Sequence, residues 1–185
     1  MLQINWDELS SKNITDISKG KKTALSIGVF DGLHRGHLHL IEKITAQAPQ
    51  LLPTVICFRN NPKNRSGIIT FEEKMALLAD FGIELCVIID FSEHFGKMDG
   101  RAFIEIVSRY LSPAYIVLGA NFYCGYRRDT DAGTFKTTAE NLGISTEIVD
   151  PVMEGGLPVS SSRIRKALRA GNTDEAELLL GRPIL

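Results

Sequence analysis

The chain has 185 residues, of which 44% are hydrophobic and 23% charged, and its formal net charge is −1 at pH 7. This length suits one domain with a substantial core and is short for two. The near balance of 21 basic and 22 acidic side chains gives no basic footprint for nucleic acid or an anionic membrane, so any anion site must be local.

The cysteines and the first residues bear on the compartment. Cys57, Cys86 and Cys124 are odd in number and widely spaced, which indicates neither a disulfide framework nor a zinc site and favours a reducing compartment. The N-terminus carries early acidic residues rather than the apolar run of a secretory signal, and no stretch approaches the length of a membrane span. We expect a cytoplasmic protein with neither a membrane nor a nucleic-acid partner.

In chain order, residues 1–23 form a polar leading segment whose candidate anchors are Trp6, Ile14 and Ile17. The apolar run 24–27 then predicts a strand, and apolar residues at helical spacing predict a helix from residue 38 to about residue 48. The glycine-rich stretch 28–37 stands between them. A turn between a strand and a helix directs backbone N–H groups and the positive end of the helix at an anion, usually a phosphate.

Within that stretch, residues 34–37 read His-Arg-Gly-His and match the H-x-G-H signature of the nucleotidylyltransferase superfamily. Its members attack the α-phosphorus of a nucleoside triphosphate and expel pyrophosphate, and the protein mainly positions and stabilises the developing charge. Gly36 would let backbone and phosphate approach closely. The alternative is that both histidines are ordinary residues at the start of a helix, but two histidines flanking a glycine after a strand favour a phosphate site.

Strands and helices continue to alternate along the rest of the chain. The further predicted strands are residues 54–58, 84–90, 115–119 and 146–150. The further predicted helices are residues 71–81, 103–111, 136–142, 163–170 and 173–180, with Thr70 as the N-cap of the first. This alternation predicts a single Rossmann-like, doubly wound α/β domain with a mainly parallel sheet. Since ligands of such sheets bind at the carboxyl ends of the strands, the polar stretches 28–37, 59–62 and 119–131 should converge on one crevice.

Four segments carry a resemblance to a known family. They are GVFDGLHRGH at residues 28–37, LGANFYCG at 118–125, VSSSRIR at 159–165 and LLGRP at 179–183. In this order they resemble the FMN adenylyltransferase (FAD synthetase) module of the prokaryotic bifunctional riboflavin kinase/FMN adenylyltransferase family, over nearly the whole chain. The resemblance implies a nucleotidyltransferase that converts FMN and ATP into FAD and pyrophosphate with Mg²⁺. It ends where a riboflavin kinase module would begin, so we expect one FMN adenylyltransferase-like domain over residues 1–185 and no kinase domain.

Carried over position by position, the resemblance implies a set of site residues. The catalytic residues would be His34, His37 and Arg165. The ATP-binding residues would be Gly28, Phe30, Asp31, Gly32, Gly36, Ser161, Ser162 and Arg165. The flavin-binding residues would be Asn61, Pro62, Asn121, Phe122 and Tyr123. The metal ligands stay unassigned, because Mg²⁺ on a triphosphate commonly keeps several waters and few protein ligands.

Some of these assignments have simpler alternatives. Asp31 could contact Mg²⁺ or water, but we favour hydrogen bonds to the N–H groups of its own loop. One serine of the three at 160–162 suffices as a helix N-cap. Arg127 and Arg128 could reach a phosphate or form a solvated pair in their loop.

The chain also departs from the family pattern. Residues 58–62 read Phe-Arg-Asn-Asn-Pro where the family has F-[DE]-P-H-P, Cys124 replaces an aromatic residue, and Val29 replaces a polar one. Two other functions therefore stay open: a nucleotidylyltransferase for another phosphorylated acceptor, and a flavin- or nucleotide-binding protein with weak or lost turnover. Release of pyrophosphate separates the enzymes from the binding protein, and the choice of acceptor separates the two enzymes.

Overall fold

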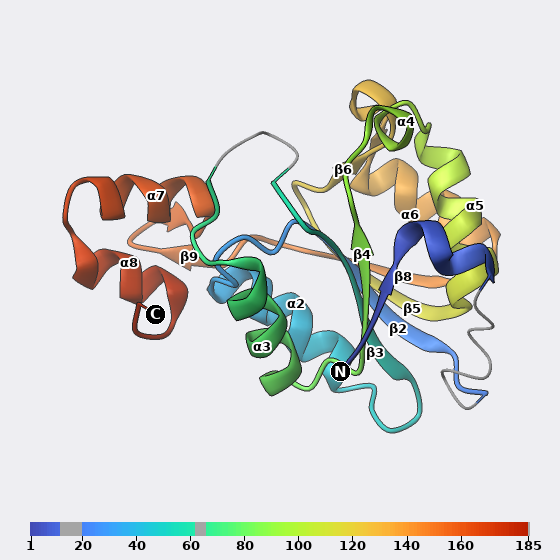
Figure 1. Ribbon diagram of the computed structural model, residues 1–185, viewed down its shortest axis with the longest axis horizontal. Helices are drawn as coiled ribbons and strands as arrows, with labels where there is room; N and C mark the ends of the chain where they lie inside the picture. The colour runs from blue at the N-terminus through green and yellow to red at the C-terminus, as the bar shows by residue number, and fades with distance from the viewer. Residues whose placement is uncertain (12–19, 62–65, 185) are drawn as a thin grey trace.

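A parallel sheet forms the centre of the molecule. The computed structural model describes residues 1–11, 20–61 and 66–184 (Figure 1). The sheet comprises β1 (Leu2–Asn5), β2 (Thr23–Ile27), β3 (Leu52–Phe58), β4 (Leu85–Ile89), β5 (Pro113–Gly119) and β8 (Ser145–Val149). Its six strands run in the order β1-β4-β3-β2-β5-β8, and every neighbouring pair is parallel. The predicted Rossmann-like, doubly wound α/β fold is confirmed.

Helices cover both faces of this sheet (Figure 1). The helices of one face are α2 (Arg35–Thr45) and α3 (Phe71–Asp80), and those of the other are α5 (Gly100–Leu111) and α6 (Ala132–Asn141). Successive side chains of a strand point to opposite faces, so each central strand contributes to both layers. In β3, Ile56 packs in the layer with α5, whereas Val55 packs in the layer with α2 and α3.

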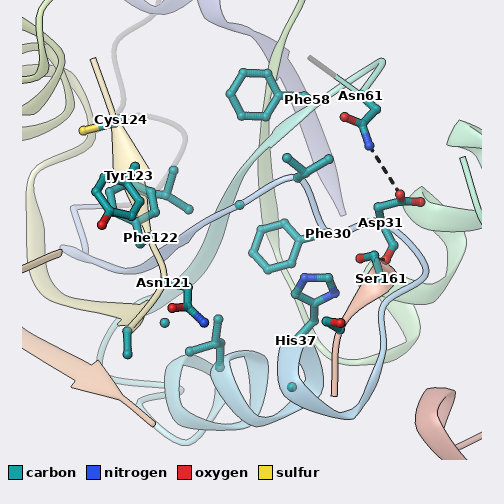
Figure 2. Close-up of a pocket in the computed structure, with 18 of the residues that line it drawn as sticks. Phe30, Asp31, His37, Phe58, Asn61, Asn121, Phe122, Tyr123, Cys124 and Ser161 are labelled. Carbon is teal, nitrogen blue, oxygen red and sulfur yellow. Dashed lines mark hydrogen bonds between the residues drawn. The ribbon is translucent and has the colours of Figure 1, made fainter. Parts of the chain in front are cut away.

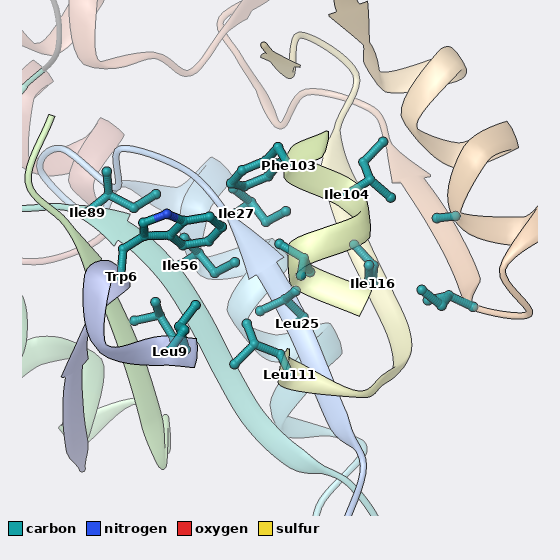
Figure 3. Close-up of a cluster of buried hydrophobic side chains, with 14 of the residues drawn as sticks. Trp6, Leu9, Leu25, Ile27, Ile56, Ile89, Phe103, Ile104, Leu111 and Ile116 are labelled. Atoms are coloured by element: carbon teal, nitrogen blue, oxygen red, sulfur yellow. The ribbon is translucent and has the colours of Figure 1, made fainter. Parts of the chain in front are cut away.

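The layer on the α5 face holds the single tryptophan of the chain. Trp6 begins the 3₁₀ helix η1 (Trp6–Ser11), stacks on Phe103 with ring centroids 5.2 Å apart, and meets the ring of Phe95 edge-on at 5.6 Å. Figure 3 shows its indole beside Phe103 and close to the strand residue Ile56. The predicted anchoring by Trp6 is confirmed, whereas Ile14 and Ile17 lie outside the described residues.

A smaller unit formed by the last part of the chain packs at one end of the molecule (Figure 1). It contains a hairpin of β9 (Met153–Glu154) and β10 (Leu157–Pro158), followed by α7 (Ser161–Arg169) and α8 (Thr173–Leu180). Arg163 holds the unit together, because its guanidinium donates to the Glu154 carbonyl at 2.7 Å and to the Glu175 carboxylate at 3.0 Å. The unit thereby fixes the start of α7.

The structure contains elements that the sequence pattern did not predict. Strand β1 lies at the sheet edge with one of its residues buried, so it lacks the alternation that marks a strand. Within stretches predicted as loops lie α4 (Glu93–Gly96) and an antiparallel pair of β6 (Tyr123–Cys124) with β7 (Thr130–Asp131). Segments this short contain too few residues to reveal a period. Helix α6 begins earlier than predicted because the carboxylate of Asp131 accepts from the Thr134 N–H at 2.8 Å and caps it.

All three cysteines are free thiols, as the sequence predicts. The Sγ atoms of Cys57 and Cys86, on the neighbouring strands β3 and β4, lie 3.5 Å apart in contact without a covalent bond. Across the described residues, no helix combines the length and apolar character needed to cross a lipid bilayer.

We predict that Thr70→Ala lowers the free energy of unfolding by about 1 kcal/mol, the usual cost of losing an N-cap. Thr70 accepts from the Glu73 N–H at 3.1 Å, and Glu73 in return accepts from the Thr70 N–H at 2.6 Å, so the start of α3 carries a reciprocal capping box. Urea denaturation measures the loss. Thr137→Ala is the control, because this exposed hydroxyl bonds within α6 to the Gly133 carbonyl and its removal should change stability by only a few tenths of a kcal/mol. Equal losses in both variants would contradict the capping role.

Candidate active site

A cavity of about 830 Å³ opens at the carboxyl ends of the strands (Figure 2). It is lined by the turn after β2, the stretch after β3, the stretch after β5 and the start of α7. The predicted convergence of the polar stretches is therefore confirmed. The predicted site residues that line the cavity are Gly28, Phe30, Asp31, His34, Gly36, His37, Asn61, Asn121, Phe122, Tyr123, Ser161, Ser162 and Arg165.

Among the predicted site residues that the structure describes, Gly32 does not line the cavity. Pro62 lies outside the described residues. Gly32 is buried behind the turn, where its carbonyl accepts from the Arg182 guanidinium at 2.7 Å. Its φ of +82° is left-handed, and a Cβ there would lie 3.1 Å from the side chain of Ile68. The structure gives Gly32 a role in the shape of the turn rather than in the cavity wall.

The turn after β2 is held in shape by buried apolar side chains. Phe30 and Leu33 adopt left-handed backbone conformations with φ of 50° and 43°, which cost of order 1–3 kcal/mol each for residues other than glycine. Both side chains are completely buried. Packing therefore stabilises a backbone shape that these residues would otherwise avoid.

The two histidines of the H-x-G-H motif stack against each other at the start of α2. Their ring centroids are 3.6 Å apart with an angle of 15° between the planes. His34 is the N-cap of the helix, and its Nδ1 accepts from the His37 N–H at 3.4 Å. Phe30 packs against the ring of His37 with centroids 5.4 Å apart (Figure 2). A Cβ on Gly36 would lie 3.2 Å from the His34 ring, so glycine leaves that ring its room.

Both histidines are neutral at pH 7. Burial lowers the pKa of His34 from 6.5 to about 4. The pKa of His37 is lowered well below 6.5 by desolvation, and also by the nearby His34 and Lys74. Because Nδ1 of His34 accepts a hydrogen bond, the neutral ring carries its proton on Nε2. The Nδ1 atom of His37 is buried and has no partner among the described residues.

Asp31 joins the turn to distant parts of the chain. Its carboxylate forms a buried ion pair with Arg165 of α7 and accepts from the Ile68 N–H at 2.8 Å. Asn61 donates to the same carboxylate at 3.4 Å (Figure 2). The hypothesis that Asp31 bonds to N–H groups of its own loop is therefore wrong. Its donors come from the stretch between β3 and α3 and from α7.

One of the three serines at the start of α7 caps the helix, and the other two are left for other contacts. Ser160 alone caps the helix by accepting from the Arg163 N–H at 3.3 Å. Ser161 instead donates to the Asp31 carbonyl at 3.0 Å, and Ser162 is exposed at the cavity. The N-terminus of α7 thus lies beside the turn after β2 that leads to His34 and His37, hereafter the histidine turn (residues 28–37). The positive dipole end of α7 lies at the cavity.

A group of phenylalanines lining the cavity was missed from the sequence. This aromatic wall consists of Phe58, Phe91, Phe95 and Phe103. Neighbouring rings have centroids 5.9–6.2 Å apart, within the range of favourable aromatic contacts. The four residues come from β3, the connection after β4, α4 and α5, so no single local spacing joins them.

Lys74 is a second residue missed from the sequence. It lies on the buried face of α3, and its Nζ donates to the Phe58 carbonyl at 2.6 Å and to the Val29 carbonyl at 3.4 Å. It thereby ties together the stretches that leave β2 and β3. A signal for it was present, because helical spacing places Lys74 on the same buried face as Met75 and Leu78.

A short flap, residues 123–131, borders the cavity after β5 and contains β6, the 3₁₀ turn η2 (Tyr126–Arg128) and β7. Its base is locked to α5, since the Asp129 carboxylate accepts from the Gly100 N–H at 3.1 Å. A Cβ on Gly125 would lie 2.0 Å from that carboxylate, so only glycine fits there. Arg127 and Arg128 have left-handed φ values of 55° and 62°.

Comparison with known proteins decides the family. Residues 16–163 match the family model described as FAD synthetase. The chain belongs to the FAD synthetase family. The match spans the histidine turn, the flap and the first turn of α7, all of which contribute to the cavity lining.

Relatives of this FAD synthetase family member are named bifunctional riboflavin kinase/FMN adenylyltransferase. The protein from Buchnera aphidicola subsp. Acyrthosiphon pisum (strain APS) is 29% identical over 92% of this chain and 57% of its own length. The Escherichia coli (strain K12) protein is 28% identical over 86% of this chain and 54% of its own length. The Bacillus subtilis (strain 168) protein is 29% identical over 88% of this chain and 54% of its own length. The chain spans little more than half the length of these relatives.

A solved structure has the same fold. It is the crystal structure of a protein named a macrolide-efflux protein, from Streptococcus pneumoniae, with a TM-score of 0.83 and 27% sequence identity. The alignment covers 100% of this chain and 61% of the other chain. The whole architecture of this FAD synthetase family member, including its α7–α8 unit, is therefore shared with a known structure.

Arg59, the basic residue of the stretch that departs from the family pattern, lies outside the cavity. Arg59 donates to the Asp90 carboxylate at 2.7 Å and to Asn5 at 3.3 Å, and its guanidinium lies 4.7 Å from the centre of the Phe71 ring. It is absent from the cavity lining, whereas Asn61 is present. The basic substitution therefore joins the ends of β1, β3 and β4 and adds no charge to the site. Cys124 and Val29 do line the cavity.

We predict that acid destabilises this fold partly through His34. Its folded-state pKa of about 4 lies below 6.5, so between these values the unfolded chain binds the proton more tightly. The contribution of His34 to the free energy of unfolding is complete above about pH 6.5 and falls by roughly 3 kcal/mol as the pH drops toward about 4. His34→Asn keeps a capping acceptor and removes the titration. Urea denaturation at about pH 7.5 and about pH 4.5 should show a smaller loss in the variant, and equal losses would contradict this account.

Proposed function

We propose that this chain transfers the adenylyl group of ATP to FMN, giving FAD and pyrophosphate. The observation that supports this most directly is the stacked pair of neutral histidines beside the N-terminus of α7, in a cavity of about 830 Å³. That volume is typical of sites for ligands of nucleotide size. An oxygen of the FMN phosphate would attack the α-phosphorus of ATP, and the bond from that phosphorus to the bridging oxygen would break as pyrophosphate leaves.

The triphosphate end of ATP would lie at the start of α7. Ser161, Ser162 and the N-terminus of this helix offer hydroxyl and N–H donors, and Arg165 offers a planar guanidinium. Arg165 bonds to Asp31 and to the Ser66 carbonyl at 3.2 Å, and its buried Nε has no partner within the described ranges. Arg165 thus retains donor capacity for a phosphate. The close approach would be permitted by Gly28 and Gly36.

His34 and His37 would stabilise the charge that develops on the attacked α-phosphate. As neutral rings they would act as N–H donors rather than as proton sources. Preorganised donors of this kind contribute most where water is excluded. The stacking of the rings and the cap of α2 hold them in place before substrate arrives.

The flavin would lie between the aromatic wall and the stretch after β5. The isoalloxazine ring is broad and flat, and the wall offers several phenylalanine rings for stacking. Asn61, Asn121, Phe122 and Tyr123 line the same cavity and would contact the flavin. Pro62 stays a prediction from the sequence.

Mg²⁺ would enter with ATP. Among the described residues no cluster of three or more His, Cys, Asp or Glu side chains is arranged to hold a metal ion. The Asp31 carboxylate is engaged by Arg165 and the Ile68 N–H. Such surroundings fit an ion held mainly by substrate phosphates and water. When bound, Mg²⁺ would neutralise charge on the triphosphate.

The catalytic proposal is first tested by incubating the purified chain with FMN, ATP and Mg²⁺ and measuring FAD and pyrophosphate together. We expect equal amounts of both. In His37→Ala, turnover should fall roughly 10²-fold or more, as when other charge-stabilising donors are removed. His39→Ala on the same helix is the control, because His39 lies outside the cavity lining and should turn over normally. Normal turnover by a folded His37→Ala variant would refute the role of His37.

The triphosphate assignment is tested with Arg165→Ala. We predict a larger rise in the KM for ATP than in the KM for FMN, because the lost guanidinium would contact ATP. Arg169→Ala, one turn further along α7 and outside the cavity lining, should leave both KM values unchanged. Equal rises in the two KM values would remove Arg165 from the triphosphate.

A further inference from the structure

The positive side chains already described near the histidines are engaged within the protein, since Lys74 donates to the carbonyls of Phe58 and Val29. Arg165 is paired with Asp31, and the two histidines are neutral. The proposed reaction nevertheless brings two anions together, a triphosphate and a phosphomonoester. Like charges at close range repel strongly in a site that excludes water. The proposed Mg²⁺ would neutralise charge on the triphosphate, so the acceptor phosphate would need a positive partner of its own.

The flap supplies two arginines at the cavity. Arg127 and Arg128 both line it, and neither has a carboxylate partner within 4 Å among the described residues. Arg128 lies with its guanidinium carbon 4.0 Å from the centre of the Tyr123 ring, and Arg127 lies 5.1 Å from that of Tyr126. Stacking occupies the face of a guanidinium and leaves its N–H edge free for an anion.

The flap presents these arginines from a fixed base. Asp129 binds the Gly100 N–H and the Thr130 hydroxyl, at 3.1 Å and 2.8 Å. In Figure 2, Tyr123 lies on one side of the cavity, and Asp31 and Ser161 lie on the other. The ring that supports Arg128 thus faces the proposed triphosphate end across the space where the two substrates would meet.

We propose that Arg128, stacked on Tyr123, binds the phosphate of the acceptor FMN. This inference rests on the proposed function and adds the group that distinguishes FMN from riboflavin. The start of α7 already offers donors to the triphosphate, so the acceptor phosphate is the anion without a partner. A guanidinium can bind two oxygens of one phosphate side by side. Arg128 would hold the attacking phosphate and offset its repulsion from ATP.

The test compares two ligands that differ only in the phosphate. FMN and riboflavin are titrated into the wild-type chain and into Arg128→Ala, Arg128→Lys, Arg127→Ala and Arg109→Ala, with binding read from flavin fluorescence. Arg109 is a matched control, because its guanidinium carbon lies 5.4 Å from the centre of the Tyr110 ring outside the cavity. Circular dichroism verifies that each variant folds.

In Arg128→Ala the preference for FMN over riboflavin should fall roughly tenfold to a hundredfold, the range for a charge-assisted hydrogen-bonded pair. Riboflavin affinity should stay within about twofold, because it has no phosphate to lose. Arg128→Lys should keep part of the preference through its charge, and Arg109→Ala should keep all of it. The KM for FMN should rise with the loss of preference.

Equal weakening of FMN and riboflavin in Arg128→Ala would overturn the proposal, because the stack would then only shape the flavin site. An unchanged preference would overturn it as well, as would a loss confined to Arg127→Ala. In these cases the wild-type chain still binds FMN and forms FAD, so the proposed function survives. If the wild-type chain binds neither flavin, the proposed function and this inference both fail.

Discussion

The carboxylate of Asp31 connects parts of the chain that are distant in sequence. It accepts from Arg165 in α7, from the Ile68 N–H and from Asn61, while its own backbone carbonyl accepts from Ser161. A buried carboxylate is costly unless such donors surround it. The contacts therefore favour one placement of the α7–α8 unit over the histidine turn. Through these bonds Asp31 holds α7 and Asn61, from the stretch after β3, beside the turn that leads to the H-x-G-H pair.

In this site, buried apolar side chains determine the shape of the turn, whereas desolvation and ion pairing determine the charge of its polar groups. Apolar burial of Phe30 and Leu33 fixes the turn, and desolvation keeps the histidines uncharged. Arg59, the basic residue in the altered stretch after β3, is bound to Asp90 and Asn5 away from the cavity. A substitution at position 59 can therefore replace an acidic by a basic residue without adding charge beside His34 and His37. This explains how an intact H-x-G-H motif and an altered stretch after β3 occur in one chain.

Features that depend on neighbouring residues were predictable from the sequence. The strand, turn and helix from residue 23 to residue 45 follow from a local hydrophobic pattern and a glycine-rich motif, and the Thr70 cap follows from its position before acidic residues. The bond from Arg165 to Asp31 spans 134 positions, and no local pattern encodes it. The aromatic wall and the flap escaped for the same reason, because Phe58 and Phe95 or Gly125 and Gly100 meet only after the sheet has formed.

The contact of Trp6 with Phe103 and Phe95 gives the protein an optical property. The chain has one tryptophan, and both rings that touch it line the cavity. Its emission would therefore originate one side chain away from a ligand in the cavity, with no second indole to obscure it. A flavin absorbs in the region where indole emits, so energy transfer would dim this emission as the cavity fills. If FMN binds as proposed, occupancy of the site could be followed in the unlabelled molecule by its own fluorescence.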